Sequence, residues 1–142
     1  MPIRPELRWF YPIDWPELSR RIRFGRAGGR CEHCGRPHGT IIRQLEDGRW
    51  YDEKTGCWRD DSGDEAAWPD VVEYAGVRTK SIRLGTAHLD HDPANSKPAN
   101  LRALCQRCHL RHDRKEHMRR RRITFNLRKA LGDLFDGQYR PW

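Results

Sequence analysis

The chain has 142 residues, of which 36% are hydrophobic and 34% are charged, and its formal net charge is +8 with a pI of about 9.7. This length and composition predict one domain with a small hydrophobic core. Such a core is usually stabilised by a bound metal or by disulfides. The opening residues lack the apolar core of a secretory signal, and no stretch approaches the roughly 20 apolar residues of a membrane span. We therefore expect a cytoplasmic protein with no membrane partner. The excess of arginine, whose planar guanidinium suits phosphate, favours nucleic acid as the partner.

A helix is predicted over residues 14–25. Asp14 is the candidate N-cap, Pro16 suits the first turn, and Gly25 is placed to end the helix. Apolar residues recur at helical spacing at Trp15, Leu18 and Ile22. We expect this helix to be a structural brace rather than a phosphate-binding element, because it carries no chemically special group.

Four of the five cysteines form two Cys-x-x-Cys pairs, Cys31 with Cys34 and Cys105 with Cys108. A Cys-x-x-Cys followed by glycine, as in the first pair, is the form of a zinc knuckle. Two such pairs supply the four thiolates of one tetrahedral structural Zn²⁺ when the fold brings them together. The sequence therefore predicts one such site. Cys57 has no partner at metal-ligand spacing and is expected to be a free thiol.

A β-rich insertion is predicted over residues 40–80. An Asp-Gly step at Asp47-Gly48 between runs of strand-forming residues is typical of a hairpin. The predicted elements are strands at 41–45 and 49–52, a loop at 59–70 and a single strand at 77–89. The tryptophans of the insertion are expected to form a small core rather than to stack on bases; they are Trp50, Trp58 and Trp68.

Residues 86–113, TAHLDHDPANSKPANLRALCQRCHLRHD, hold four of the seven histidines and two of the five cysteines. A packing core does not need such a density of metal-ligand and acid/base side chains. The stretch therefore predicts a site that binds a ligand and cleaves it.

Three segments within this stretch follow one another in a recognisable order. They are Ala87-His88-Leu89, then Asn100-Leu101-Arg102-Ala103-Leu104, then Cys105-x-x-Cys108-His109. Together they resemble the HNH endonuclease family, small ββα-metal nucleases often found in phages, restriction systems and mobile introns, in the form that carries zinc knuckles. The resemblance covers about residues 30 to 113.

The resemblance implies an α+β fold. A ββα-metal (HNH) core would be stapled by the four-cysteine zinc site, with a β-rich insertion and flanking N- and C-terminal helices. The whole chain, 1–142, would be a single nuclease domain. Its parts would be an N-terminal helix at 14–25, the zinc-knuckle and ββα-metal core at 31–113, and a basic tail with a C-terminal helix at 114–142.

The activity implied by the resemblance is metal-dependent hydrolysis of phosphodiester bonds in DNA. His88 matches the general base, because its spacing of 12 residues to Asn100 is that of compact family members. His91 is the alternative base. Asn100 would hold the loop and orient the base, and His109 would ligate a catalytic divalent ion, Mg²⁺, Mn²⁺, Ni²⁺ or Zn²⁺.

Position 87 departs from the family pattern, which usually has a ligand, Asp or His, immediately before the base. Asp90 is the expected replacement ligand, because strand alternation would place residues 88 and 90 on one face. With His91 as the base, Asp90 would again be the ligand before it. Asp113 lies four residues after His109, on the same helix face, and is expected to complete the site.

Two alternatives remain open from the sequence. Ala87 can mark a decayed HNH site in a non-catalytic, zinc-containing DNA-binding module. The second alternative is a structural zinc protein with no nucleic-acid role, which the net charge of +8 disfavours.

The C-terminal part of the chain is strongly basic, and a last amphipathic helix is predicted there, ending at Gly137. Its apolar stripe consists of Leu127, Leu131, Leu134 and Phe135. The expected partner is DNA, as a duplex, within the bacterial host cytoplasm if the chain is phage-encoded. Arginines expected to contact phosphates are Arg107, Arg111, Arg114, Arg119, Arg120, Arg121 and Arg122.

Overall fold

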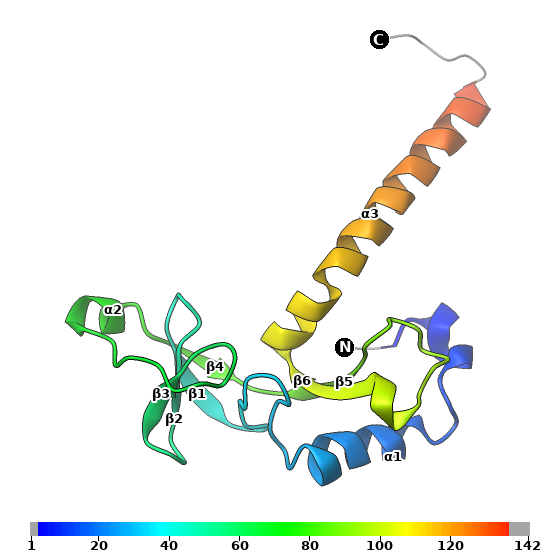
Figure 1. Cartoon of the computed structure of the whole chain (residues 1–142). Helices are drawn as coiled ribbons and strands as arrows, with labels where there is room; N and C mark the ends of the chain where they lie inside the picture. Colours follow the sequence, from blue (N-terminus) through cyan, green and yellow to red (C-terminus); the bar gives the residue numbers. More distant parts are fainter. Residues whose placement is uncertain (1–2, 137–142) are drawn as a thin grey trace. The chain divides into compact units, whose positions relative to one another are not determined.

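The computed structural model describes residues 3–136, with side chains described as far as residue 130. The chain divides into a first unit, Met1–Leu110, and a second unit, Arg111–Trp142. The fold is mixed α+β, as predicted, and its strands pair antiparallel; Figure 1 shows the elements in chain order. In the part of the chain that the structure describes, no helix combines the length and the apolar character needed to cross a bilayer.

The first unit carries all the strands of the described residues. Its elements are η1 (Pro5–Phe10), α1 (Trp15–Arg20), η2 (Arg21–Arg26), β1 (Ile41–Gln44), β2 (Trp50–Asp52), β3 (Cys57–Arg59), α2 (Val71–Ala75), β4 (Arg78–Ser81), β5 (Leu84–His88), η3 (Pro98–Asn100) and β6 (Leu101–Cys105). Helix α3 (Gln106–Asp136) begins directly after β6 and continues into the second unit.

The predicted N-terminal helix begins at Trp15 and continues beyond α1 as the π-helical segment η2. The side-chain carboxylate of Asp14 makes no capping hydrogen bond. The backbone carbonyl oxygen of Asp14 accepts the N–H of Leu18 at 2.9 Å. Ile22 is buried, and Ser19 Oγ lies 2.8 Å from Thr86 Oγ1 in β5. The expected bracing role of this helix is confirmed, because its apolar face packs on the core formed with β5 and β6.

The predicted Asp-Gly hairpin is also confirmed, with β1 and β2 antiparallel and Gln44 opposite Trp50. Gly48 has φ of 97°, a left-handed conformation that glycine adopts without steric cost. The four-stranded sheet has the order β3-β2-β1-β4. Trp50 and Trp58 are buried in this part of the chain, as expected, whereas Trp68 is 66% exposed.

The prediction of one strand over residues 77–89 is wrong. The chain forms β4, which pairs with β1, and then β5, which pairs with β6 in a separate two-stranded sheet. The two strands have different partners, and this tertiary pairing divides a run that local propensity leaves continuous. Helix α2 within the insertion was not predicted, although Asp70 and Glu73 form a capping box at its start.

The β5–β6 hairpin pairs His88 with Leu101 and Leu84 with Cys105. Helix α3 then runs without interruption over 31 residues, so the expected separate C-terminal helix is part of one longer helix. No glycine or proline interrupts residues 106–130, and nothing else there would stop a helix. Of the predicted apolar stripe, Leu127 is 59% exposed. The side chains of Leu131, Leu134 and Phe135, and Gly137 as the helix stop, lie outside the described residues.

Candidate metal and catalytic sites

The four cysteines of the two Cys-x-x-Cys pairs meet in the interior of the first unit. Their sulfur atoms all lie within 4.8 Å of one another, and Cys34 Sγ is 3.6 Å from Cys105 Sγ. All four side chains are buried, and none forms a disulfide. The predicted clustering is confirmed. Four converging thiols in a closed, buried arrangement can hold a metal ion with tetrahedral preference.

A tight turn forms the first pair. The N–H of Gly35 donates to the carbonyl of Cys31 at 2.9 Å, and the N–H of Cys31 donates to the carbonyl of Arg36 at 3.0 Å. Gly35 has φ of 78°, so a side chain at this position would strain the turn. The turn therefore points two sulfur atoms, those of Cys31 and Cys34, in one direction.

Glu32 brings this turn to the second pair. Its N–H donates to the carbonyl of Ala103 in β6 at 2.9 Å, and its carboxylate accepts the N–H of Ala103 at 2.7 Å. Cys105 ends β6 and Cys108 lies in the first turn of α3, so docking on β6 sets the distance between the pairs. Glu32 was not singled out in the sequence, where nothing distinguishes it from a solvated carboxylate.

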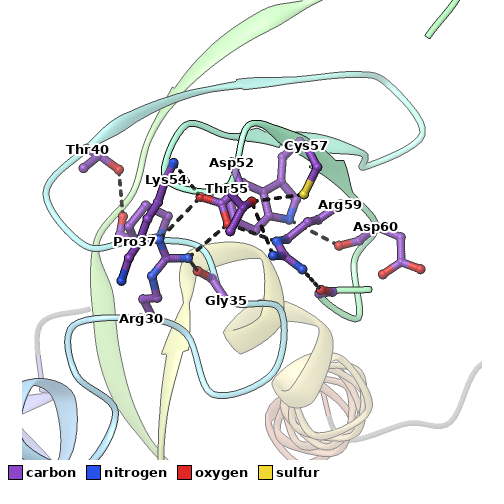
Figure 2. Close-up of polar contacts among 12 residues, drawn as sticks. Arg30, Gly35, Pro37, Thr40, Asp52, Lys54, Thr55, Cys57, Arg59 and Asp60 are labelled. Atoms are coloured by element: carbon purple, nitrogen blue, oxygen red, sulfur yellow. Dashed lines mark hydrogen bonds and ion pairs between the residues drawn. The ribbon is translucent and has the colours of Figure 1, made fainter. Parts of the chain in front are cut away.

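A second anchor for the turn is the buried carboxylate of Asp52 in β2, drawn in Figure 2. Its oxygens accept from Arg30 Nη1 and Nη2 at 3.4 Å each and from Arg59 Nε at 3.0 Å. Burial opposes ionisation of Asp52, but the two guanidinium groups dominate and lower its pKa. Arg30 also donates to the carbonyl of Gly35 at 3.0 Å, so this network joins the insertion to the turn.

The thiols share hydrogen bonds, and this makes some of them easier to ionise than an isolated cysteine. The pKa of Cys105 is lowered to about 7, chiefly because the thiol of Cys108 donates a hydrogen bond to it. The pKa of Cys31 is also lowered, with Cys105 as the largest cause, whereas the pKa values of Cys34 and Cys108 are raised, again chiefly by Cys105. Metal binding requires thiolates, and a bound cation would offset the repulsion that keeps these four thiols from ionising together.

Arg36 follows the first pair and is fully buried. Its Nη2 donates to the carbonyl of Gly48 at 2.8 Å and to Asp61 Oδ1 at 3.2 Å, while its guanidinium carbon lies 5.5 Å from the centre of the Trp50 ring. Within the described residues, Nε and Nη1 of Arg36 are buried and have no hydrogen-bond partner. An uncompensated buried cation is costly, so this arginine fits a site whose thiolates carry negative charge around a metal.

Asp61 binds a second arginine, Arg107 of α3. The two side chains form a bidentate pair, with Arg107 Nε and Nη2 at 2.8 and 2.9 Å from Oδ1 and Oδ2 of Asp61. A Cβ atom at position 48 would collide with the Asp61 carboxylate, so Gly48 is needed for this close approach as well as for its positive φ. Arg107 was expected to contact phosphate, and here its guanidinium is bound by a carboxylate.

The predicted general base, His88, ends β5 and is 8% exposed. Its imidazole stacks on the indole of Trp15 and meets the ring of Tyr11 edge-on at 5.5 Å, while its Nε2 lies 3.1 Å from Ser96 Oγ. Burial lowers the pKa of His88, against the opposing charges of Asp90 and Asp92. Trp15, Tyr11 and Ser96 were missed as neighbours of His88. The two aromatic residues lie far from it in the sequence and no local pattern connects them.

Asp90 is exposed and organises the loop that follows β5. Its Oδ1 accepts from Asn100 Nδ2 at 2.8 Å and from the N–H of Asp92 at 2.9 Å, and its Oδ2 accepts from Asn95 Nδ2 at 2.8 Å. These donors, Asn100 first among them, lower the pKa of Asp90 to about 2. The strand ends at His88, so the strand alternation that we used to place residues 88 and 90 on one face does not reach Asp90.

Asn100 closes the same loop, as its expected loop-holding role requires. Its Nδ2 also donates to the carbonyl of Asn95 at 2.8 Å, and its backbone carbonyl accepts the N–H of Leu89 at 2.8 Å. His91 has φ of 60°, a left-handed conformation that is uncommon for a residue with a side chain. The loop between β5 and β6 is therefore a defined structure, held by amide and carboxylate groups.

His109 packs on the other face of β5. A Cβ atom at Gly85 would lie 3.4 Å from Nδ1 of His109, and Ala87, 2% exposed, points to the same face as Gly85 by strand alternation. Thr86 and His88 point toward α1 instead. The structure thus places the expected base and the expected helix ligand on opposite faces of the strand. It also places position 87, the usual ligand position, on the face next to His109.

The remaining predicted site residues lie on α3 beyond Leu110, in the second unit. Asp113 is one helical turn after His109. Arg119 and Arg120 pair with Glu116 at 3.2 and 2.8 Å. Of the arginines expected to contact phosphate in this part of the helix, Arg120 is half-buried and the others are exposed: Arg111, Arg114, Arg119, Arg121 and Arg122.

Comparison of the chain with protein-family models, with curated proteins and with solved structures returns no match.

Proposed function

We propose that this protein is a metal-dependent endonuclease that hydrolyses phosphodiester bonds in DNA. The observation that supports this most strongly is the β5–β6 hairpin running directly into α3. His88 lies at the end of the first strand, Asn100 immediately before the second and His109 in the first turn of the helix. These are the residues on which the sequence resembles HNH nucleases.

In this proposal His88 accepts a proton from the attacking water. A base must be unprotonated near neutral pH, and burial favours the neutral imidazole by lowering the pKa of His88. Asn100 holds the loop that carries Asp90, and this carboxylate is ionised because its pKa is about 2. His109 and Asp90 are the proposed ligands of a divalent ion, Mg²⁺, Mn²⁺, Ni²⁺ or Zn²⁺. The ion would stabilise charge on the scissile phosphate.

The four-cysteine cluster is proposed to hold one Zn²⁺ with a structural role. Its sulfur atoms leave no position for substrate, because all four ligands come from the protein and are buried. The ion would tie the Cys31–Cys34 turn to the start of α3. Such a site needs reduced thiols, which is consistent with a reducing compartment such as a bacterial cytoplasm.

Duplex DNA is the proposed partner, and α3 is its proposed contact. Residues 106–130 contain ten Lys and Arg against two carboxylates, Asp113 and Glu116. Side chains of this kind neutralise phosphates and release counterions, which gives binding that weakens with salt.

A second candidate function is a non-catalytic, zinc-containing DNA-binding module. Ala87 favours it, because the side chain that faces His109 from β5 has no ligand atom. The stacking of His88 under Trp15 favours it too, since water must reach the imidazole for a proton to be transferred. In this case the loop and the hairpin are structural, and only α3 and the zinc site carry function.

Incubation with supercoiled plasmid and Mg²⁺, Mn²⁺ or Ni²⁺ distinguishes the two candidates. The nuclease proposal expects wild type to relax or linearise the plasmid, and His88→Ala to abolish cleavage while DNA binding is kept. His33→Ala is the matched control, because His33 is exposed and lies outside the loop. Cleavage that is abolished in His91→Ala but kept in His88→Ala would assign the base to His91. Binding without cleavage under every metal would favour the non-catalytic module.

DNA binding through α3 has its own test. Arg121 and Arg122 are both exposed, and the double variant Arg121→Ala/Arg122→Ala is expected to weaken binding. It should also reduce the slope of log K against log salt concentration by about 0.9 for each phosphate that is no longer neutralised. The control, Arg43→Ala/Arg78→Ala, removes two exposed arginines from β1 and β4. An equal drop in affinity in both variants would mean that only net charge matters, and that α3 is not the contact.

A further inference from the structure

Arg36 carries a positive charge that its oxygen partners do not fully compensate. A guanidinium is charged at all relevant pH values, so its burial requires an opposite charge nearby. The carboxylate of Asp61 is one such charge, but Arg107 shares it through a bidentate pair. One carboxylate thus serves two guanidinium groups, and two buried nitrogens of Arg36, Nε and Nη1, have no partner among the described residues.

A second source of negative charge is the cysteine cluster. Arg36 lies two residues after Cys34, and its carbonyl accepts the N–H of Cys31 at 3.0 Å, so Arg36 belongs to the turn that carries two of the thiols. Four thiolates around one Zn²⁺ carry a net charge of −2, by simple addition of formal charges. In a buried site, this net negative charge is unfavourable, and so is the uncompensated positive charge of Arg36.

We propose that Arg36 balances the charge of the metal-bound cysteines by donating a hydrogen bond from Nε or Nη1 to the sulfur of Cys34. The carbonyl of Gly48 and the carboxylate of Asp61 hold the guanidinium in position through Nη2, and the ring of Trp50 lies against it. All three belong to the insertion between the two cysteine pairs. The insertion therefore serves the metal centre by positioning a cation beside it.

Arg36 is a positioning residue in this proposal, since it acts on the metal through a ligand. An N–H···S hydrogen bond withdraws charge from a thiolate, so Cys34 should be a weaker nucleophile and a more stably bound ligand than an uncompensated cysteine. The inference rests on metal binding at the four cysteines, which is part of the proposed function, and it does not depend on nuclease activity.

The test compares zinc-loaded wild type with Arg36→Met, Arg36→Lys and Arg43→Met. Competition with a chromophoric chelator is expected to show zinc affinity about 10- to 100-fold lower in Arg36→Met. Iodoacetamide should alkylate the cysteines of this variant faster than those of wild type. Arg36→Lys keeps the charge without the planar fork and should recover part of both properties. Arg43→Met changes an exposed arginine of β1 and should behave as wild type.

A folded Arg36→Met protein with the zinc affinity and alkylation rate of wild type would overturn the proposal. So would a drop in affinity that Arg36→Lys does not recover at all, because the effect would then come from packing. Circular dichroism and the fluorescence of the buried tryptophans establish whether each variant is folded.

The wild-type chain loaded with ¹¹³Cd²⁺ gives a second test, which decides the question if Arg36→Met does not fold. A guanidinium N–H bonded to a coordinating sulfur should show scalar coupling to cadmium across the hydrogen bond. Resolved Arg36 resonances without that coupling would overturn the proposal. If wild type binds neither zinc nor cadmium through these thiols, the metal centre itself is refuted, which is a different failure.

Discussion

The imidazole of His88 and the indole of Trp15 are stacked, with ring centroids 5.0 Å apart and ring planes inclined by 17°. Trp15 begins α1, and His88 ends β5. The stack joins the N-terminal helix to the hairpin and removes the imidazole from water, which disfavours its protonated form.

Trp15→Ala should expose His88 and raise its pKa toward its ordinary value, because the indole that excludes water is gone. We expect the free energy of unfolding to fall by about 2 kcal/mol, less than for a fully buried tryptophan because Trp15 is only half-buried. NMR titration of the histidine ring protons and chemical denaturation measure the two effects. Trp9→Ala, which removes a 92% exposed indole, should change neither. A His88 pKa at or above the ordinary value in wild type would contradict this account.

Stability should depend on pH through the same histidine. The pKa of His88 is lowered in the folded state, so the unfolded chain takes up a proton first on acidification. The stabilisation is therefore complete above the unfolded pKa of roughly 6.5 and is lost as the pH falls from there toward the folded pKa. His88→Gln should reduce the fall in unfolding free energy over this window, as measured by chemical denaturation at a series of pH values.

The lowered pKa of His38 acts in the same direction, so His88→Gln should reduce the pH dependence without removing it. An unchanged slope in His88→Gln would mean that burial of His88 is not linked to folding.

With the proposed structural zinc, Cys31→Ser should abolish tight metal binding and unfold much of the first unit, because three thiolates cannot close the site and binding of a structural metal is linked to folding. Metal analysis after dialysis should find about one zinc per wild-type chain and none per variant. Cys57→Ser is the matched control, since Cys57 lies outside the cluster and its sulfur contacts Thr55 Oγ1 at 3.0 Å. A Cys31→Ser protein that retains zinc and secondary structure would refute the structural role.

Asn100→Ala should raise the pKa of Asp90 from about 2 toward the ordinary value of roughly 3.9. The amide of Asn100 is the largest cause of the lowered pKa, and alanine cannot donate. Carbon-detected NMR titration of the Asp90 carboxyl group measures this change. Asn95→Ala should shift the pKa less, since Asn95 makes a smaller contribution, and Asn126→Ala on α3 should not shift it. Equal pKa values in all the variants would exclude the loop network.

Local rules made part of this structure predictable from the sequence. The Cys-x-x-Cys turns and the Asp47-Gly48 hairpin depend on a few adjacent residues, and both form as expected. Helix α2 could have been found in the same way, because Asp70 and Glu73 have the spacing of a capping box. Its five residues are too few for a hydrophobic period to reveal it.

Contacts between distant parts of the chain were not predictable from local patterns. Residues 78–88 resemble one strand until tertiary pairing gives β4 and β5 different partners. The rings of Tyr11 and Trp15 pack against His88, and Gly48 and Asp61 accept hydrogen bonds from Arg36. Each of these contacts joins separate segments of the chain and forms only in the complete tertiary structure, so no local sequence pattern predicts it.

Cys34 and Cys105, whose sulfur atoms lie 3.6 Å apart, are separated by 71 positions in the sequence. A ribosome adds about 5–20 residues per second, so the first cysteine pair would wait on the order of 4 to 14 seconds for the second. Until then the nascent chain contains only two of the four thiols of the cluster, those of Cys31 and Cys34. Assembly of this protein in a cell would therefore be sensitive to oxidants during synthesis, at a stage that the finished, buried cluster no longer exposes.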